Sequence, residues 1–304
     1  MRGSLLCVLW LAACYDPGVP AGAPCMVDGP CPDGQLCVNG VCTASSSLPP
    51  GDRDGDGRAD DRDNCASVTN PEQLNEDGDR FGDACDPCPH IADDAPRDSD
   101  GDGLSDACDP NPVGGIVDSR WQFDGFHQLP RWTISPGWIV AGDGDNLRVA
   151  SPGVNDVTEF LTVPLFGSGR TSFANFTASI AVVFDGVVGP TQSNFGFNAY
   201  DRSQDKSMFC HLYQPTSNAG DRRLLLLDTL AVNNQPPFAW QNATRYILTL
   251  DARGGQYTCS VVGPSGQQTA TSSSPLTVQD GNSLAIIVYG VSVRVDWVWI
   301  AGTP

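Results

Sequence analysis

The chain has 304 residues, which is enough for about two domains and one substantial hydrophobic core. It carries 36 acidic and 17 basic residues, and most of the acidic excess lies between Asp52 and Asp109. No stripe of lysine and arginine is available to neutralise phosphates, so this composition excludes a nucleic-acid-binding protein.

Residues 1–13 predict a signal peptide, with Arg2 near its start and an apolar run from Leu5 to Ala13. That run is too short to span a bilayer. The stretch that follows, Leu11-Ala12-Ala13-Cys14, resembles a bacterial lipobox, in which the peptide is removed before the cysteine and the cysteine is acylated. The resemblance implies lipidation of Cys14 and an exported protein anchored at the outer membrane or cell surface. An ordinary signal peptide cleaved at a small residue is the alternative.

The remaining cysteines also favour export. Ten are left after Cys7 and Cys14 are set aside, an even number that suits disulfides in an oxidising compartment. Residues 14–24 read as a Pro/Gly tether and residues 43–51 as a second linker. Between them lies a cysteine-rich module, residues 25–42, in which two disulfides replace a core and three pairings are open for Cys25, Cys31, Cys37 and Cys42. We expect this module to be a spacer rather than a binding site.

Residues 52–110 contain an acidic repeat with a period of 23 residues. Oxygen-bearing side chains recur at positions 1, 3, 5, 9 and 12 of each copy, and position 7 offers a backbone carbonyl. Calcium takes about six to eight hard oxygen ligands, and a loop of about twelve residues supplies them with this spacing. The repeat therefore predicts structural Ca²⁺, with a disordered acidic linker as the alternative. The expected ligands are Asp52, Asp54, Asp56, Arg58, Asp60 and Asp63; Asn75, Asp77, Asp79, Phe81, Asp83 and Asp86; and Asp98, Asp100, Asp102, Leu104, Asp106 and Asp109.

The middle copy is expected to bind calcium most weakly. Asn75 removes one charge, and Arg80 stands at position 6, where a sharp turn favours glycine. A positive φ at Arg80 would cost about 1 to 2 kcal/mol.

The cysteines and an Asn70-Pro71-Glu72-Gln73 segment distinguish these copies from EF-hands, whose flanking helices the proline-rich sequence cannot form. Together with the acidic spacing they resemble the thrombospondin type 3 repeat over residues 52–110. This resemblance implies chain wrapped around calcium with almost no secondary structure. It also implies disulfides that join Cys65 to Cys85 and Cys88 to Cys108.

From residue 116 onward the sequence alternates apolar and polar residues between turns, which predicts β-strands. Residues 176–184 alternate cleanly, residues 244–262 predict a hairpin turning at Gly254-Gly255, and residues 291–300 predict a closing strand. The expected fold class is mainly β: a C-terminal jelly-roll β-sandwich (116–304), preceded by irregular calcium-wrapped, disulfide-linked repeats and a small cysteine-rich module.

The segments 117–150 and 293–301 resemble concanavalin-A-like lectin/glucanase and laminin-G-like domains, in which the first strand pairs near the last. Members of that family bind glycans, bind proteins or cleave polysaccharides. The ExDxxE pair of carboxylates that the cleaving branch uses is not in this sequence, and Glu159 stands alone. Neither His127 nor His211 lies in a recognisable catalytic motif. We therefore expect ligand binding, with carbohydrate as the first class, and keep two alternatives: a polysaccharide-cleaving enzyme, or an adhesion module without glycan binding.

The alternation also predicts which side chains leave the core. Residues 206–214 and 195–200 place five side chains on a non-core face as candidate ligand contacts: Asn198, Tyr200, Phe209, His211 and Tyr213. A face covered by loops is the alternative. Trp297 and Trp299 share a phase with Val293 and Val295, which predicts core positions. Cys210 and Cys259 are both in phase with core residues and are expected to be bonded, whereas Asp143 and Asp145 fit a polar turn better than a calcium site.

Overall fold

The structure is a computed structural model that describes residues 35–38, 41–44, 51–113, 118–126, 133–134, 138–140, 147–150, 159–164, 172–173, 175–187, 192–201, 206–228, 233–253, 255–273, 278–279 and 283–303. The predictions for Cys14, Cys25, Cys31, His127 and the Asp143–Asp145 turn lie outside these residues. Among the described residues no helix is long and apolar enough to cross a membrane.

Two compact units make up the chain. The first extends to Asn75 and takes in residues 80–86, and the second comprises residues 76–79 and 87–304. In the first unit β1 (Gln35–Val38) and β2 (Val41–Ala44) form an antiparallel pair with Cys37 opposite Cys42. Residues 51–113 consist of turns and bends without a helix or strand, as the resemblance to thrombospondin type 3 repeats implies.

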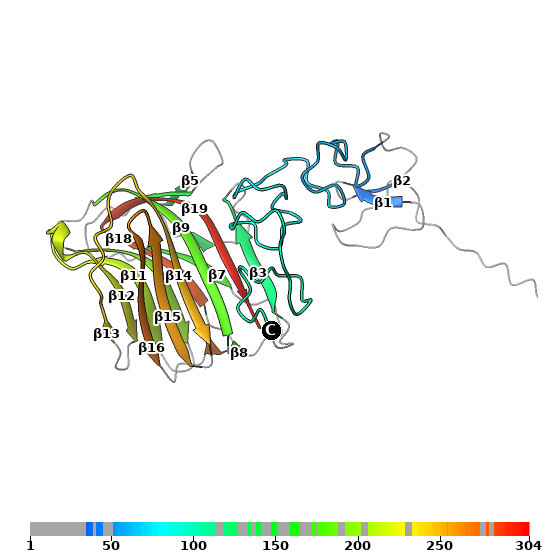
Figure 1. Ribbon diagram of the computed structural model, residues 1–304. Helices are drawn as coiled ribbons and strands as arrows, with labels where there is room; N and C mark the ends of the chain where they lie inside the picture. Colours follow the sequence, from blue (N-terminus) through cyan, green and yellow to red (C-terminus); the bar gives the residue numbers. More distant parts are fainter. Residues whose placement is uncertain are drawn as a thin grey trace, which may run out of the picture. The chain divides into compact units, whose positions relative to one another are not determined.

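The second unit contains a β-sandwich of two antiparallel sheets (Figure 1). The seven-stranded sheet has the order β13 (Asn233–Asn234), β12 (Arg223–Asp228), β11 (Lys206–Gln214), β10 (Ser193–Asp201), β18 (Ser283–Tyr289), β7 (Glu159–Pro164), β4 (Thr133–Ile134). The eight-stranded sheet has the order β16 (Gly266–Ser273), β15 (Gln256–Gly263), β14 (Arg245–Arg253), β9 (Asn175–Val187), β19 (Val291–Gly302), β6 (Leu147–Ala150), β5 (Trp138–Val140), and β3 (Ser119–Asp124) also pairs with β19. A small sheet joins β8 (Ser172–Phe173) to β17 (Val278–Gln279), and one 3-10 turn covers Ala219–Asp221.

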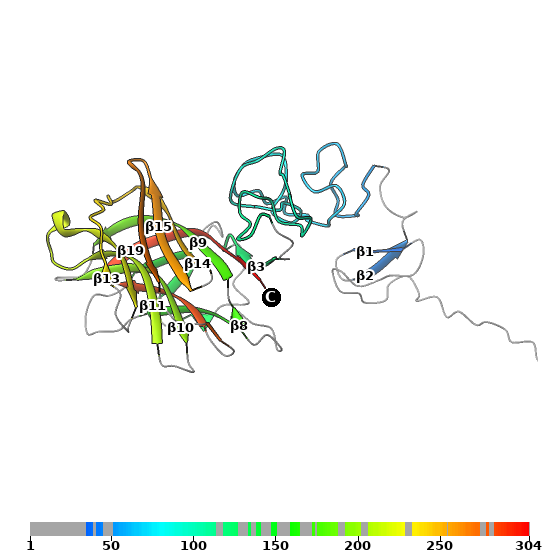
Figure 2. The same ribbon diagram turned by 60° about the horizontal axis from the view of Figure 1, so that its bottom comes forward.

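The two sheets form the two layers of the sandwich (Figure 2). Alternating side chains from both sheets make up its buried core. Every second residue of β9 is buried in this core, as residues 176–184 predict: Phe176, Ala178, Ile180, Val182 and Phe184. The predicted hairpin is also confirmed, because β14 and β15 pair with Arg253 opposite Gln256. The first strand of the sandwich, β3, lies beside the last, β19, as expected.

The three disulfides for which both cysteines are described agree with the predictions. Cys65 is bonded to Cys85 and Cys88 to Cys108. The third bond crosses the core from Cys210 in β11 to Cys259 in β15, and both side chains are fully buried. It therefore ties the seven-stranded sheet to the eight-stranded one.

The prediction that Trp297 and Trp299 face the core beside Val293 and Val295 is wrong. The pairing of β19 with β9 shifts register between Val295 and Trp297, so the extra residue, Asp296, reverses the alternation. Beyond this bulge Val298 and Ile300 enter the core, and both tryptophans lie on the outer face of the sheet. They are nevertheless buried, at 1% and 0% exposure.

The last acidic repeat covers these tryptophans. Its disulfide Cys88–Cys108 and Leu104 form a second apolar cluster with Trp297, Trp299, Ala181 and Ala301, separate from the main core. The His90 ring lies 4.7 Å from the Trp297 ring and 4.8 Å from the Trp299 ring, centre to centre. The final repeat is therefore packed onto the sandwich by Trp297 and Trp299, which the alternation pattern had placed in the main core.

Candidate metal centres and ligand face

The first acidic loop gathers three carboxylates at one point. Asp52, Asp54 and Asp56 are all buried, and one oxygen of each lies within 4.8 Å of the other two. Gly55 and Gly57 both have positive φ, which lets their N–H groups turn inward and donate to the Asp52 carboxylate at 2.8 and 3.1 Å. These hydrogen bonds hold the loop in its conformation without a bound ion.

Two carboxylate oxygens in this loop have no hydrogen-bond partner among the described residues. Asp54 Oδ2 and Asp63 Oδ2 are buried and unpaired. The pKa of Asp54 is raised to about 6, mainly by burial and also by the nearby carboxylates of Asp56, Asp63 and Asp52, against a backbone hydrogen bond that lowers it. Two carboxylates about 4 Å apart repel by about 4 kcal/mol at an effective dielectric of about 20. A hard cation fits this donor set, because it removes the repulsion and satisfies the free oxygens together.

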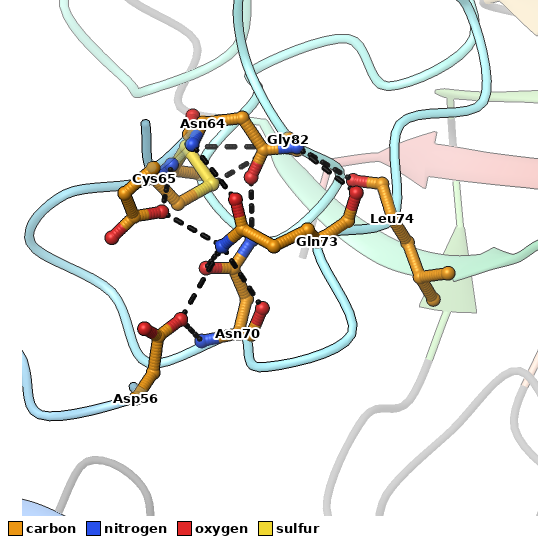
Figure 3. Close-up of a disulfide and its surroundings, with 9 residues drawn as sticks. Asp56, Asn64, Cys65, Asn70, Gln73, Leu74 and Gly82 are labelled. Atoms are coloured by element: carbon orange, nitrogen blue, oxygen red, sulfur yellow. Dashed lines mark hydrogen bonds between the residues drawn. A yellow bond between two sulfur atoms is a disulfide. The ribbon is translucent and has the colours of Figure 1, made fainter. Parts of the chain in front are cut away.

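Gln73 joins the loop to the turn that follows it (Figure 3). Its Nε2 donates to Asp63 Oδ1 at 2.8 Å and to Asp56 Oδ2 at 3.3 Å, while its Oε1 accepts from the Asn64 N–H at 3.1 Å. The backbone of Gln73 has φ +55°, a strained conformation for a residue with a side chain. The Asn-Pro-x-Gln segment thus holds two carboxylates of the loop, Asp56 and Asp63, in place.

Gly82 packs closely against Asn64, where a side chain would collide. Its N–H donates to the Asn64 carbonyl at 3.0 Å, and a Cβ at Gly82 would lie 2.3 Å from Asn64 Oδ1. The disulfide Cys65–Cys85 closes the same turn, so the first loop and the chain after it are locked by covalent and hydrogen bonds.

The position-9 aspartates lie outside the carboxylate clusters. Asp60 accepts from the Arg53 N–H at 2.8 Å, and Asp106 accepts from the Ser99 N–H at 2.8 Å and the Ser99 hydroxyl at 2.7 Å. Arg53 and Arg97 also lie near them, at 4.0 and 3.4 Å. Both aspartates brace the start of their own loop.

The third loop repeats the first. Asp98, Asp100 and Asp102 each offer an oxygen within 4.8 Å of the others, and both oxygens of Asp100 are buried without a partner. The N–H groups of Gly103 and Gly101 hold the pKa of Asp98 below its usual range. Leu104, the position-7 residue, is buried by its side chain in the cluster with Trp297, so this loop is also attached to the sandwich.

A second cluster in the third loop contains a residue that the sequence analysis missed. Asp102, Asp109 and Asp118 offer oxygens within 4.8 Å of one another, and Asp118 is 1% exposed. Its N–H donates to Asp102 Oδ2 at 2.6 Å and its Oδ2 accepts from Asn111 Nδ2 at 2.6 Å, which leaves Oδ1 unpaired. Burial raises the pKa of Asp109 to about 7.

Asp118 makes a backbone hydrogen bond that has an equivalent in each of the other two repeats. The position-5 aspartates accept a backbone hydrogen bond from Asn70 in the first copy (3.1 Å), from Asp93 in the second (2.9 Å) and from Asp118 in the third. Asn70 and Asp93 are 23 residues apart, but Asp118 follows after 25. The two extra residues hid this equivalence from an analysis of fixed spacing.

The middle loop is divided between the two units, with Asp77 and Asp79 in the second and Asn75, Phe81, Asp83 and Asp86 in the first. The expected strain at Arg80 is wrong, because Arg80 is not among the non-glycine residues with positive φ, whereas Gly78 takes φ +77°. The Arg80 guanidinium lies over the Phe81 ring at 4.4 Å. The lower charge from Asn75 remains the reason to expect weaker binding there.

The candidate ligand face lies on the outer side of β10 and β11. Register places Asn198 opposite Phe209, Gly196 opposite His211, and Asn194 opposite Tyr213. Phe209, Tyr213 and Asn198 are half-buried, whereas His211 is 4% exposed. Tyr200 pairs with Ser207, but its side chain lies outside the described part. The sequence analysis missed Asn194, which pairs with Tyr213 on one side and with Tyr289 on the other, and it missed Tyr289 as well. Both could have been found from the same alternation.

Three polar atoms of residues on this face are buried and have no hydrogen-bond partner among the described residues: Asn194 Oδ1, Asn198 Oδ1 and His211 Nε2. Gly196 makes room for the imidazole, since a Cβ there would lie 2.9 Å from His211 Cδ2 and 2.1 Å from the Cys210 carbonyl. The face therefore combines aromatic rings with unpaired amide and imidazole atoms, which are groups that bind hydroxyls.

The imidazole of His211 is expected to stay neutral down to acidic pH. Burial lowers its pKa to about 3, against a hydrogen bond with the Phe197 backbone that raises it. Because the pKa in the folded state lies below the unfolded value of about 6.5, the neutral ring contributes stability above pH 6.5 that is lost as the pH falls toward 3. NMR of the His211 ring protons should show no titration between pH 8 and pH 5. A midpoint near pH 6.5 would contradict this burial.

No protein-family model matches this chain, and no curated protein matches it in sequence. Similar solved structures include a GH43B protein from Bacteroides ovatus described by its xyloglucan locus, with 19% identity and a TM-score of 0.44 over 59% of this chain and 38% of that one. Peanut lectin has 11% identity and a TM-score of 0.42 over 61% of this chain and 97% of the lectin. Lectin II from Ulex europaeus has 12% identity and a TM-score of 0.44 over 60% of this chain and all of the lectin (100%). This chain thus spans less than half of the first structure's length.

Proposed function

We propose that this protein is a calcium-binding, lipid-anchored surface protein whose β-sandwich binds a ligand, with carbohydrate as the expected class. Calcium is structural and holds the acidic loops together. The observation that carries the calcium assignment is the convergence of Asp52, Asp54 and Asp56, all buried, with Asp54 Oδ2 left unpaired. Ca²⁺ prefers hard oxygen ligands at this spacing, whereas softer metals prefer sulfur and nitrogen ligands.

Equilibrium dialysis of the full chain against calcium, followed by elemental analysis, tests the assignment. The wild-type chain should retain calcium at millimolar free concentration and lose it to a chelator. Asp54→Asn should retain less, whereas Asp61→Asn, which removes the same charge from an exposed residue outside the clusters, should match the wild type. A chain that retains no calcium would refute the proposal.

Asp118 is expected to be a calcium ligand even though it lies beyond the predicted loop. Replacing residues that only orient metal ligands typically costs about 10- to 100-fold in affinity, so losing a ligand oxygen should cost at least about tenfold. Calcium titration of Asp118→Asn should show this loss for part of the bound ions, while Asp61→Asn should behave as the wild type. Equal titrations of Asp118→Asn and the wild type would remove Asp118 from the ligand set.

The ligand-binding part rests on the unpaired atoms of Asn194, Asn198 and His211 beside Tyr213 on the outer face of β10 and β11. A glycan array probed with the calcium-loaded chain tests it. Tyr213→Ala should lower the signal at least about tenfold, because stacking and its hydrogen bonds contribute together. Val262→Ala, an exposed change in the other sheet, is the control. Full binding by Tyr213→Ala would exclude this face.

The same array separates the alternatives. An adhesion module without glycan binding would give no signal on any glycan. A polysaccharide-cleaving enzyme would release reducing sugar from the polysaccharides that bind, which a binding protein does not.

A further inference from the structure

A pocket of about 390 Å³ lies within the second unit, between the last acidic repeat and the outer face of the eight-stranded sheet. The sheet supplies a floor of hydroxyl side chains from β9, β14, β15 and β16: Thr177, Ser179, Thr249, Thr258, Ser260 and Thr269. His90, Ile91 and Trp299 line it as well. Its volume falls in the range of about 300 to 1,000 Å³ typical of small-molecule sites. It is on the opposite sheet from the β10–β11 face.

Two of the lining residues carry buried polar atoms that nothing in the described structure satisfies. Trp299 is fully buried, yet its Nε1–H has no acceptor, and His90 Nδ1 has no partner either. Buried indole N–H groups normally find an acceptor, because leaving one unpaired is costly. The centres of the two rings lie 4.8 Å apart, and both rings line the pocket.

The hydroxyl floor is ordered but retains hydrogen-bonding capacity. Ser179 and Thr249 are linked at 2.9 Å, and Thr177 donates to Asp251 at 2.8 Å. Each hydroxyl can donate once and accept twice, so these pairs leave acceptors available. A ligand with several hydroxyl groups would match this surface.

The charges around the pocket select against ions. Arg253 is paired with Asp251 at 3.0 Å, and Asp109 is the other acidic residue in the lining. Burial lowers the pKa of His90 to about 3, so the imidazole carries no charge at neutral pH. The pocket thus has no free cation to hold an anion, its Asp251 carboxylate is paired with Arg253, and Asp109 belongs to the carboxylate cluster with Asp102 and Asp118.

We propose that this pocket binds a neutral polyhydroxylated molecule about the size of a monosaccharide, recognised by the hydroxyl floor beside the rings of Trp299 and His90. This site is independent of the β10–β11 face. The last acidic repeat forms one wall, so the site exists only while that repeat is packed on the sheet.

The test uses the calcium-loaded full chain labelled with ¹⁵N and titrated with glucose, galactose, mannose and N-acetylglucosamine at millimolar concentrations. At least one sugar should shift the indole N–H signal of Trp299, which Trp299→Phe identifies by its loss. Ser260→Tyr and Thr269→Tyr should fill the pocket and abolish the shift. Thr271→Tyr is the matched control, because Thr271 is an exposed threonine two residues from Thr269 on the same strand but outside the lining.

The outcomes separate this site from the other one. Retention of the shift in Tyr213→Ala supports a second site, whereas its loss there assigns the binding to the β10–β11 face and overturns the proposal. The proposal is also overturned if none of the four sugars moves the indole signal, which would indicate that the pocket holds water alone. Equal binding by Ser260→Tyr and the wild type would overturn it as well.

Discussion

Chelation of calcium is expected to loosen the first acidic loop much more than the last one. Among the described residues no apolar cluster packs beneath the carboxylates of Asp52, Asp54 and Asp56, so in that part of the chain hydrogen bonds and one disulfide oppose their repulsion when no ion is bound. An ion present at 100 times its Kd stabilises the folded form by about 2.7 kcal/mol. The last repeat keeps Leu104 and the Cys88–Cys108 bond packed on Trp297 even when metal is removed.

Hydrogen exchange with and without a chelator measures this difference. Amide exchange in residues 51–75 should rise by about 100-fold, in line with the stabilisation lost, while residues 104–109 change less. Readdition of calcium should restore protection, and magnesium should restore less because it demands a smaller octahedral site. Unchanged exchange in residues 51–75 would show that the loops fold without metal.

Trp297→Ala is expected to destabilise the protein by about 3 to 5 kcal/mol, the usual cost of removing a fully buried tryptophan. The loss should concentrate on the last repeat, because the ring packs against His90 and the cluster that contains Cys88 and Leu104. Denaturant unfolding gives the free energy, and hydrogen exchange of residues 87–113 shows where protection is lost.

Two matched variants make this result specific. Val295→Ala removes a core side chain from the inner side of the same strand and should weaken the sandwich without selectively exposing the repeat. Val262→Ala changes a side chain that is 44% exposed and should stay within about 0.5 kcal/mol of the wild type. If Trp297→Ala and Val295→Ala gave the same exchange pattern, the repeat would not be held by the outer face of β19.

Local patterns in the sequence determined the aspartate clusters, the disulfides and many of the core-facing side chains. The 23-residue spacing identified the aspartates that converge, since a near-extended chain turns every second side chain toward one point. The resemblance to thrombospondin type 3 repeats implied the bonds Cys65–Cys85 and Cys88–Cys108. The alternation in residues 176–184 and 206–214 predicted which side chains enter the core, including Cys210, which is bonded to Cys259. Each of these features can be read from spacing, alternation or a motif along the chain.

The tertiary structure decided what depends on register and on distant segments. A single bulge at Asp296 moved Trp297 and Trp299 to the outer face, and no alternation pattern reveals where one residue is inserted. Asp118 joined a carboxylate cluster because the backbone after the last loop returns to Asp102, two residues later than the period predicts. The hydroxyl-lined pocket arises only where the last repeat meets four strands brought together by the sheet, because its lining comes from residues 90 to 299.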